Sequence, residues 1–126
     1  MIQVGQTLTH TQTLTQNDFS RFATLSGDDN PIHVDAEFSA RTRFGKPVAH
    51  GMYLYSLICG VILKQFPGAT QVSQELMFPA PSLVGEAVEV RARVLEIHDN
   101  TIRFETTVAK ANGELGVQGE AVWRVK

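Results

Sequence analysis

Hydrophobic and polar residues alternate along the second half of the chain, from Gln71 onward. A period of two is typical of strands that bury one face and expose the other. Turn signals interrupt the alternation at Asp99-Asn100 and at Asn112-Gly113, and the second pair is a strong hairpin signal. We therefore predict four antiparallel strands, near residues 72–78, 88–94, 102–108 and 115–123, with one apolar face.

The first half has the spacing of helices. Phe19, Phe22 and Ala23 recur at intervals of three and four residues, which predicts a short amphipathic helix. Thr15 is a suitable N-cap residue, and Gly27 can end the helix in a left-handed conformation. Residues 2–14 are rich in Thr and Gln, and we expect a weak strand or an extended arm there.

Residues 49–66, AHGMYLYSLICGVILKQF, are apolar on every side of a helix, which is typical of a helix that is buried all round. A sheet with one apolar face needs a cover, and this helix is the only all-apolar element in the sequence. We therefore predict one α+β domain over residues 1–126, in which an antiparallel sheet wraps around one long buried helix.

The composition of the chain argues against several functional classes. The chain has 126 residues, of which 43% are hydrophobic, and a net charge of −2, so nothing indicates nucleic acid or an anionic membrane as a partner. The longest apolar run, residues 52–63, is too short to span a bilayer. A single cysteine, Cys59, and an N-terminus without a signal-peptide pattern favour a soluble, cytoplasmic protein.

The polar stretch LSGDDNPIH, residues 25–33, is the segment with the clearest candidate chemistry. It places a carboxylate, Asp28, five residues before an imidazole, His33. Asn30 and Pro31 lie between them and favour a turn. Two titratable groups at the ends of a stiff turn can share a water molecule or a substrate proton, so this loop is the candidate active site.

With the apolar helix that follows, this stretch resembles the MaoC-like hot-dog family, whose best-known members are (R)-specific enoyl-CoA hydratases. The family's hydratase motif runs from an aromatic residue through Ser/Thr-Gly-Asp-x-Asn-Pro-aliphatic-His to a small residue six positions later. The segment FPAPSLVGEAVEV also looks like the entrance to the family's first long strand. The residues that fill the motif here are Phe22, Leu25, Ser26, Gly27, Asp28, Asn30, Pro31, Ile32, His33 and Ser39.

The resemblance implies a hot-dog fold and a catalytic role for Asp28 and His33. The pair would add water to a trans-2-enoyl-CoA and give the (R)-3-hydroxyacyl-CoA, reversibly. The family implies no cofactor, because coenzyme A is part of the substrate. It also implies a homodimer in which the two sheets join and each site lies between subunits.

The expected chemistry suits these residue types. Water must lose a proton as it attacks an alkene carbon, and the α-carbon must gain one. Unperturbed pKa values are about 6.5 for imidazole and about 4 for a carboxyl group, so a His–Asp pair can divide the two roles near neutral pH. The sequence leaves open which of Asp28 and His33 is the base.

Other residues would complete the site. Gly51 lies at the start of the apolar helix, where free backbone N–H groups can stabilise an oxyanion by about 3 kcal/mol per donor. We expect Asn30 to brace the loop with its side chain. The family often places a small hydroxyl residue on the helix, facing the aspartate; Cys59 occupies that place here, with Ser56 one turn earlier, and the third residue stays open between them.

Simpler interpretations compete at several positions. His50 is expected to satisfy a backbone group at the helix start rather than to act as a second base. No metal is expected at His33 and His50, because further ligands at the usual close spacing are missing. Arg41, Arg43 and Lys46 could meet the phosphates of coenzyme A, but a solvated basic surface is the favoured interpretation.

Three alternative functions remain. The substrate could be an acyl carrier protein thioester, which would make the protein a 3-hydroxyacyl-ACP dehydratase of fatty acid synthesis. A hot-dog thioesterase usually has its carboxylate on or beside the buried helix, and residues 52–63 contain no Asp or Glu. A non-catalytic acyl-thioester binding module would not require an Asp–His pair in a turn.

Overall fold

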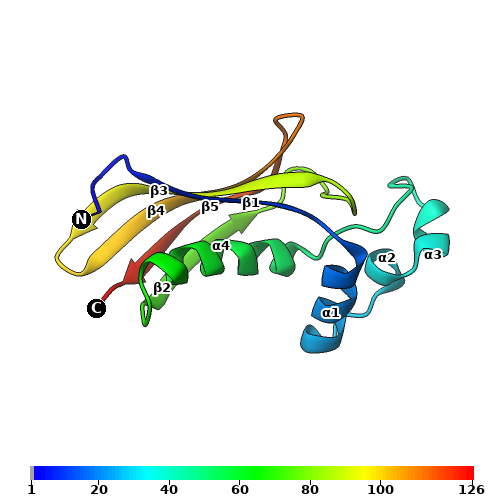
Figure 1. The fold of residues 1–126 in the computed structure, drawn as a ribbon, viewed down its shortest axis with the longest axis horizontal. Coiled ribbons are helices and arrows are strands. Elements are labelled where there is room, and N and C mark those ends of the chain that lie inside the picture. Colours follow the sequence, from blue (N-terminus) through cyan, green and yellow to red (C-terminus); the bar gives the residue numbers. More distant parts are fainter. Residues whose placement is uncertain (1) are drawn as a thin grey trace.

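The computed structural model describes residues 2–126, which form a five-stranded antiparallel sheet and four helices (Figure 1). Three short helices gather at one end of the molecule, beside the start of the long fourth helix (Figure 1). In chain order the elements are β1 (Thr7–Thr13), α1 (Gln16–Ser26), α2 (Pro31–Val34), α3 (Ala36–Ala40), α4 (Gly51–Gln65), β2 (Thr70–Met77), β3 (Ala87–His98), β4 (Thr101–Lys110) and β5 (Leu115–Arg124).

The strands lie in the order β1-β3-β4-β5-β2, so β1 and β2 form the two edges of the sheet. The four predicted strands are confirmed as β2 to β5, and the two hairpin turns fall where the sequence places them. Residues 7–13 form a fifth strand that pairs with β3 from Thr7↔Arg93 to Thr13↔Ala87. Its backbone completes the sheet at this edge although its side chains are mostly polar.

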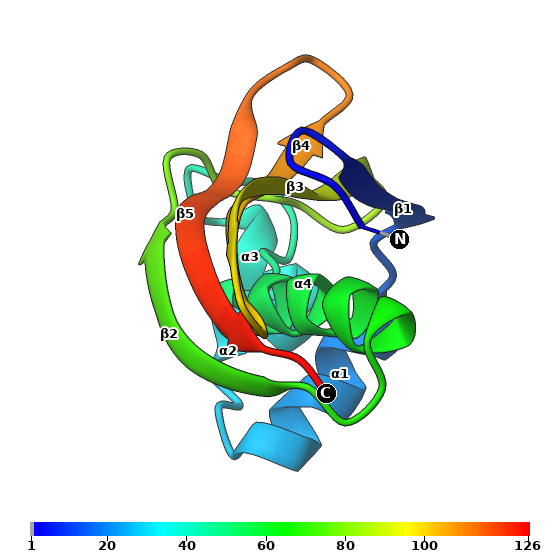
Figure 2. The same ribbon diagram turned by 90° about the vertical axis from the view of Figure 1, so that its left-hand side faces the viewer.

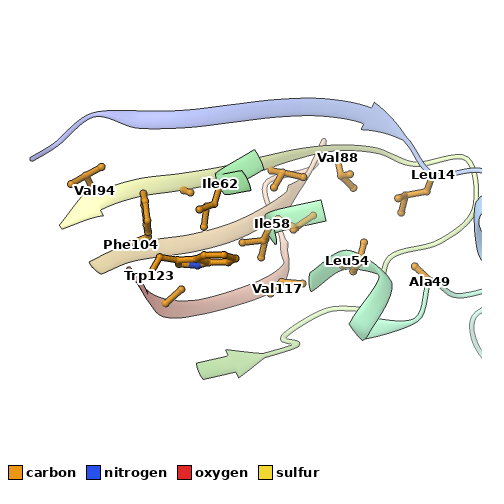
Figure 3. Packing of buried hydrophobic residues seen from close by; sticks show 14 of the residues in the cluster. Leu14, Ala49, Leu54, Ile58, Ile62, Val88, Val94, Phe104, Val117 and Trp123 are labelled. Atoms are coloured by element: carbon orange, nitrogen blue, oxygen red, sulfur yellow. The ribbon is translucent and has the colours of Figure 1, made fainter. Parts of the chain in front are cut away.

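The core lies between the sheet and α4. Figure 2 shows the sheet curving around the helix, which is the predicted hot-dog arrangement. Alternate residues of β3, β4 and β5 are buried on the inner face, as the period of two predicts. Trp123 and Phe104 pack near Ile62 at one end of α4, and Leu54 lies at the other end (Figure 3).

The prediction that α4 is buried all round is wrong for a single chain. Only Leu54, Ile58 and Ile62 are buried, one residue per turn along a single stripe. Met52 is 52% exposed and Leu63 is 39% exposed on the other sides. A sheet of one chain can cover only one side of a helix, so the other apolar sides of α4 are only partly covered. No helix within residues 2–126 is long and apolar enough to cross a membrane.

Gly119 of β5 provides a test of the sheet edge. A Cβ atom there would overlap the carbonyl oxygen of Glu75 on the neighbouring strand β2, where Leu76 pairs with Gly119. We expect Gly119→Ala to lower the free energy of unfolding by about 2–3 kcal/mol, because the backbone of β2 must move away. Urea unfolding measures this change. In the same assay Gln118→Ala, an exposed neighbour on β5, should stay within about 0.5 kcal/mol of wild type; equal stability of both variants would contradict the strand contact.

Candidate active site

The end of α1 delivers Asp28 to the site. Gly27 ends the helix with φ of 81°, in the left-handed region that glycine tolerates, and its N–H donates to Ala23 O at 2.9 Å. The Ser26 hydroxyl donates to Phe22 O at 2.7 Å and accepts from Asp28 N at 3.1 Å. The backbone of Asp28 is therefore fixed by the helix that precedes it, as the sequence predicts for Gly27.

A short helix, α2, then carries His33. The Asn30 side chain caps α2 by accepting from Ile32 N at 3.0 Å, so the predicted bracing of the loop is confirmed. Pro31 occupies the first turn, where its missing N–H costs nothing. The carbonyl of His33 accepts from the Gln16 side chain of α1 at 3.0 Å. The loop is thus held at both ends by the two helices.

Asp28 and His33 face one another as expected. Their nearest atoms, Asp28 Oδ2 and His33 Nε2, are 3.7 Å apart, which is too long for a direct hydrogen bond. His33 Nδ1 lies 2.7 Å from Val48 O, and because a carbonyl oxygen only accepts, Nδ1 carries the proton. In the neutral ring Nε2 therefore presents its lone pair toward the same space as the Asp28 carboxylate.

His50 contacts both members of this pair. Its Nε2 donates to the backbone carbonyl of Asp28 at 2.9 Å, so it does satisfy a backbone group, although not one of its own helix. Its ring also stacks on that of His33, with centroids 3.8 Å apart and planes 21° apart. Burial lowers the pKa of His50 from its ordinary value of 6.5, and the Asp28 carbonyl opposes this shift.

A cavity of about 550 Å³ opens beside the dyad. Gly51 lies in its wall at the start of α4, where the backbone N–H groups have no acceptor inside the helix and the first turn has no acidic residue. A Cβ on Gly51 would lie 2.7 Å from the Phe78 ring. The Phe78 side chain therefore fills the space that a larger residue at position 51 would need. The structure thus brings Gly51 to the same cavity as Asp28 and His33.

The opposite wall of the cavity comes from the segment before β3. Its lining includes Phe78, Pro81 and the buried Ser82. Lys110 of β4 holds this wall: its Nζ donates to Pro81 O at 2.9 Å and lies 3.3 Å from a Glu86 carboxylate oxygen. Because 92% of this lysine side chain is covered, the ion pair is largely shielded from solvent, which strengthens its hold on the wall.

Ser56 and Cys59 do not reach this cavity within one chain. Ser56 is exposed, donates to Tyr53 O, and lines separate grooves between α4 and its neighbours α1 and β1. Cys59 is half-buried beside Tyr55, whose hydroxyl donates to Gln71 of β2. Burial first, and then the Cys59 thiol, raises the pKa of Tyr55 to about 12. The third site residue therefore stays a prediction.

The sequence favours a solvated basic surface for Arg41, Arg43 and Lys46, and all three residues are exposed. Arg43 also lines the cavity and lies 4.7 Å over the Phe44 ring. Arg41 and Lys46 are exposed and do not line it.

Asp28, His33 and His50 offer possible metal-ligand atoms within 4.8 Å of one another, a cluster that the sequence spacing did not predict. The arrangement suits a metal poorly. The two imidazole rings are stacked, so their in-plane lone pairs lie in two nearly parallel planes and are poorly disposed to converge on one ion, and one nitrogen of each ring is bonded to a carbonyl.

Sequence reasoning missed the stacking of His50 on His33 and the wall at residues 78–82. The position of His50 directly before Gly51 was visible, but its partner lies 22 residues away and is a backbone atom, which side-chain motifs do not reveal.

Comparison with known proteins places this geometry in a family. Residues 2–117 match the family described as MaoC like domain. The chain therefore belongs to the MaoC-like family of hydratases and dehydratases, as the motif around Asp28 and His33 predicts.

Individual relatives cover nearly the whole chain. A 3-hydroxybutyryl-CoA dehydratase from Methylorubrum extorquens is 37% identical over 98% of this chain and 81% of its own length. A mitochondrial 3-hydroxyacyl-[acyl-carrier-protein] dehydratase from Arabidopsis thaliana is 31% identical over 96% of this chain and 76% of its own length. The solved structure of an (R)-hydratase from A. caviae involved in PHA biosynthesis has a TM-score of 0.95 and 32% identity, over 99% and 98% of the two chains.

The lowered pKa of His50 predicts a pH dependence of stability. The folded state favours the neutral ring, so below pH 6.5 the unfolded chain takes up a proton at this residue more readily than the folded chain does. The stability that the folded chain has while His50 is neutral is fully present above pH 6.5 and is lost as the pH falls below that value, through the lowered pKa of the folded state. Urea unfolding between about pH 5 and pH 7.5 should show a smaller slope with pH for His50→Gln than for wild type. Equal slopes for wild type and His50→Gln would contradict a lowered pKa of His50 in the folded chain.

Proposed function

We propose that the protein adds water to the double bond of trans-2-enoyl-CoA, and catalyses the reverse dehydration, with Asp28 and His33 as its acid–base dyad. The observation that carries the proposal is a pair of acceptors, His33 Nε2 and Asp28 Oδ2, placed 3.7 Å apart beside a cavity at the N-terminus of a helix. Two acceptors at this distance can both receive hydrogen bonds from one water molecule. Such a water is held and oriented for attack.

The steps balance without a cofactor. His33 Nε2 accepts a proton from the water as its oxygen bonds to the β-carbon, and the electron pair of the double bond moves onto the thioester oxygen. The N–H of Gly51 donates to that oxygen. The dyad then returns the proton to the α-carbon on the same face. This gives syn addition. The face of the double bond that meets the water sets the configuration at the β-carbon, and the A. caviae relative, described as an (R)-hydratase, supports the (R)-3-hydroxyacyl product.

The surroundings of the dyad support these roles. The His33 side chain is 14% exposed and its Nδ1 is fixed by Val48, which favours His33 as the base that receives the water proton. The Asp28 side chain is 57% exposed on the other side of the same space. Arg43 lines the cavity, and we propose that it meets an anionic part of the substrate.

Replacing either dyad residue tests the proposal. Asp28→Asn or His33→Ala should lower kcat for hydration of crotonyl-CoA by at least about 100-fold, because each removes a proton acceptor from the water. The measurement is the loss of enoyl-thioester absorbance. Asp29→Asn is the matched control, since Asp29 is exposed and is not the residue that faces His33, and it should leave kcat unchanged.

The same assay separates the alternatives. Turnover of crotonyl-acyl carrier protein but not of crotonyl-CoA would favour the dehydratase of fatty acid synthesis, to which the Arabidopsis relative points. Release of free thiol without a hydroxyacyl product would favour a thioesterase. Binding of the thioester with no turnover would favour the non-catalytic module.

We also propose a homodimer in which each site lies between subunits. The support is exposed apolar surface on the edge strand β2 and on α4. Val72 is 51% exposed, Met77 is 60% exposed and Met52 is 52% exposed. An uncovered edge strand with apolar side chains favours pairing with a second copy. The other edge, β1, carries mainly Thr, Gln and His.

Light scattering on the purified protein should give twice the chain mass of 13.9 kDa. A lysine at the β2 edge, Val72→Lys, should shift the mass toward one chain, because a charge would be buried in the joined sheet. Thr11→Lys on the β1 edge is the control and should leave the mass unchanged. A wild-type mass of one chain at micromolar concentration would contradict the proposal.

A further inference from the structure

His50 is enclosed by aromatic rings at the start of α4. Only 2% of the residue is exposed. Its ring centroid lies 4.9 Å from that of Phe22 and 6.5 Å from that of Phe19, both on α1. These two rings leave His50 little freedom to turn, so the positions of its two ring nitrogens are set by packing.

The two polar or stacking contacts of His50 reach different members of the dyad. The Nε2–H donates to the carbonyl of Asp28 at 2.9 Å, and the ring face lies 3.8 Å from that of His33. Neither contact uses a reacting atom, since Asp28 Oδ2 and His33 Nε2 both remain free. The same short segment also supplies Val48 O, which accepts from His33 Nδ1.

We propose that His50 is a positioning residue, which fixes the Asp28 backbone through one contact and the plane of the His33 ring through the other. This inference rests on the proposed hydratase function. In this proposal the buried His50 side chain keeps Asp28 Oδ2 and His33 Nε2 at a separation at which both can bind one water molecule.

The role requires a neutral imidazole. Donation from Nε2 to a carbonyl places the only ring proton there, so Nδ1 is unprotonated. The titratable groups that act on His50 are His33 and Asp28, while the neighbouring rings of α1 are uncharged. A protonated His50 would repel the imidazolium that forms when His33 takes the water proton, since the two rings are stacked.

Two substitutions separate the two contacts. His50→Phe keeps an aromatic ring against His33 but removes the donor to Asp28. His50→Gln keeps an N–H donor but removes the stacked ring. His98→Gln is the matched control, because the His98 side chain is 86% exposed at the β3–β4 turn, which lies at the opposite end of the molecule from α1 and α2 (Figure 1).

We expect both His50 variants to lower kcat for crotonyl-CoA hydration by at least about tenfold, because small misplacements of a catalytic group are costly. KM should stay within about threefold of wild type, since His50 does not bind the substrate in this proposal. Thermal unfolding confirms that each variant is folded at the assay temperature. A kcat within about threefold of wild type for either variant would overturn the proposal.

Nitrogen-15 NMR of the imidazole rings gives a readout that a merely structural role would not move. Wild-type His33 should show one tautomer, protonated at Nδ1, because Nδ1 donates to Val48 O. In the proposal His50 keeps the ring in the plane in which this bond forms, so a second tautomer should appear in His50→Gln while the rest of the spectrum stays folded. An unchanged tautomer population would overturn the proposal. Because this measurement needs no turnover, it also separates failure of the positioning role from failure of the hydratase function.

Discussion

The packing of α4 against the curved sheet determines the rest of the structure. Leu54, Ile58 and Ile62 fit the inner face one turn apart, so the rotation and the start of the helix are fixed by the core. The segment that enters the helix is fixed with it. Val48 and His50 belong to that segment, and they hold His33 and Asp28 respectively. The geometry of the candidate site is therefore a consequence of core packing more than of the loop alone.

Helix α4 has one buried side and other apolar sides that are exposed. Its buried stripe belongs to the core of one chain, while Met52 and Leu63 on its other sides are exposed, as are Val72 and Met77 of the edge strand β2. Cys59 lies toward that side as well, next to Tyr55 and its partner Gln71 on β2. A second subunit on this surface would bring α4 close to the all-round burial that its sequence indicates. The role of Cys59 or Ser56 then depends on the assembled protein.

The sequence predicted the parts of this structure that depend on local rules. The period of two located the strands, and the cap residues Thr15 and Gly27 located α1. The turn chemistry of Asn30 and Pro31 located the loop that holds the dyad. Each of these features depends on neighbouring residues, so a single sequence contains the necessary information.

Other features depend on contacts between distant segments. The polar strand β1 is held by backbone pairing with β3, which its side chains do not reveal. The link from His50 to the Asp28 carbonyl joins residues 22 positions apart through a main-chain atom. The exposure of α4 follows from how much helix surface one sheet can cover. Such relations appear only when the chain is folded.

The unequal exposure of the dyad shows what the site still needs for its chemistry. His33 is enclosed by α2, by the Val48 segment and by His50, whereas more than half of the Asp28 side chain faces solvent. A carboxylate in bulk water binds many exchanging waters rather than one oriented water. For the proposed hydration, the acyl thioester or the second subunit of the proposed dimer would therefore have to cover Asp28. In the proposed mechanism a free chain therefore holds His33 in place in advance, and binding of the substrate would complete the pocket around the Asp28 carboxylate.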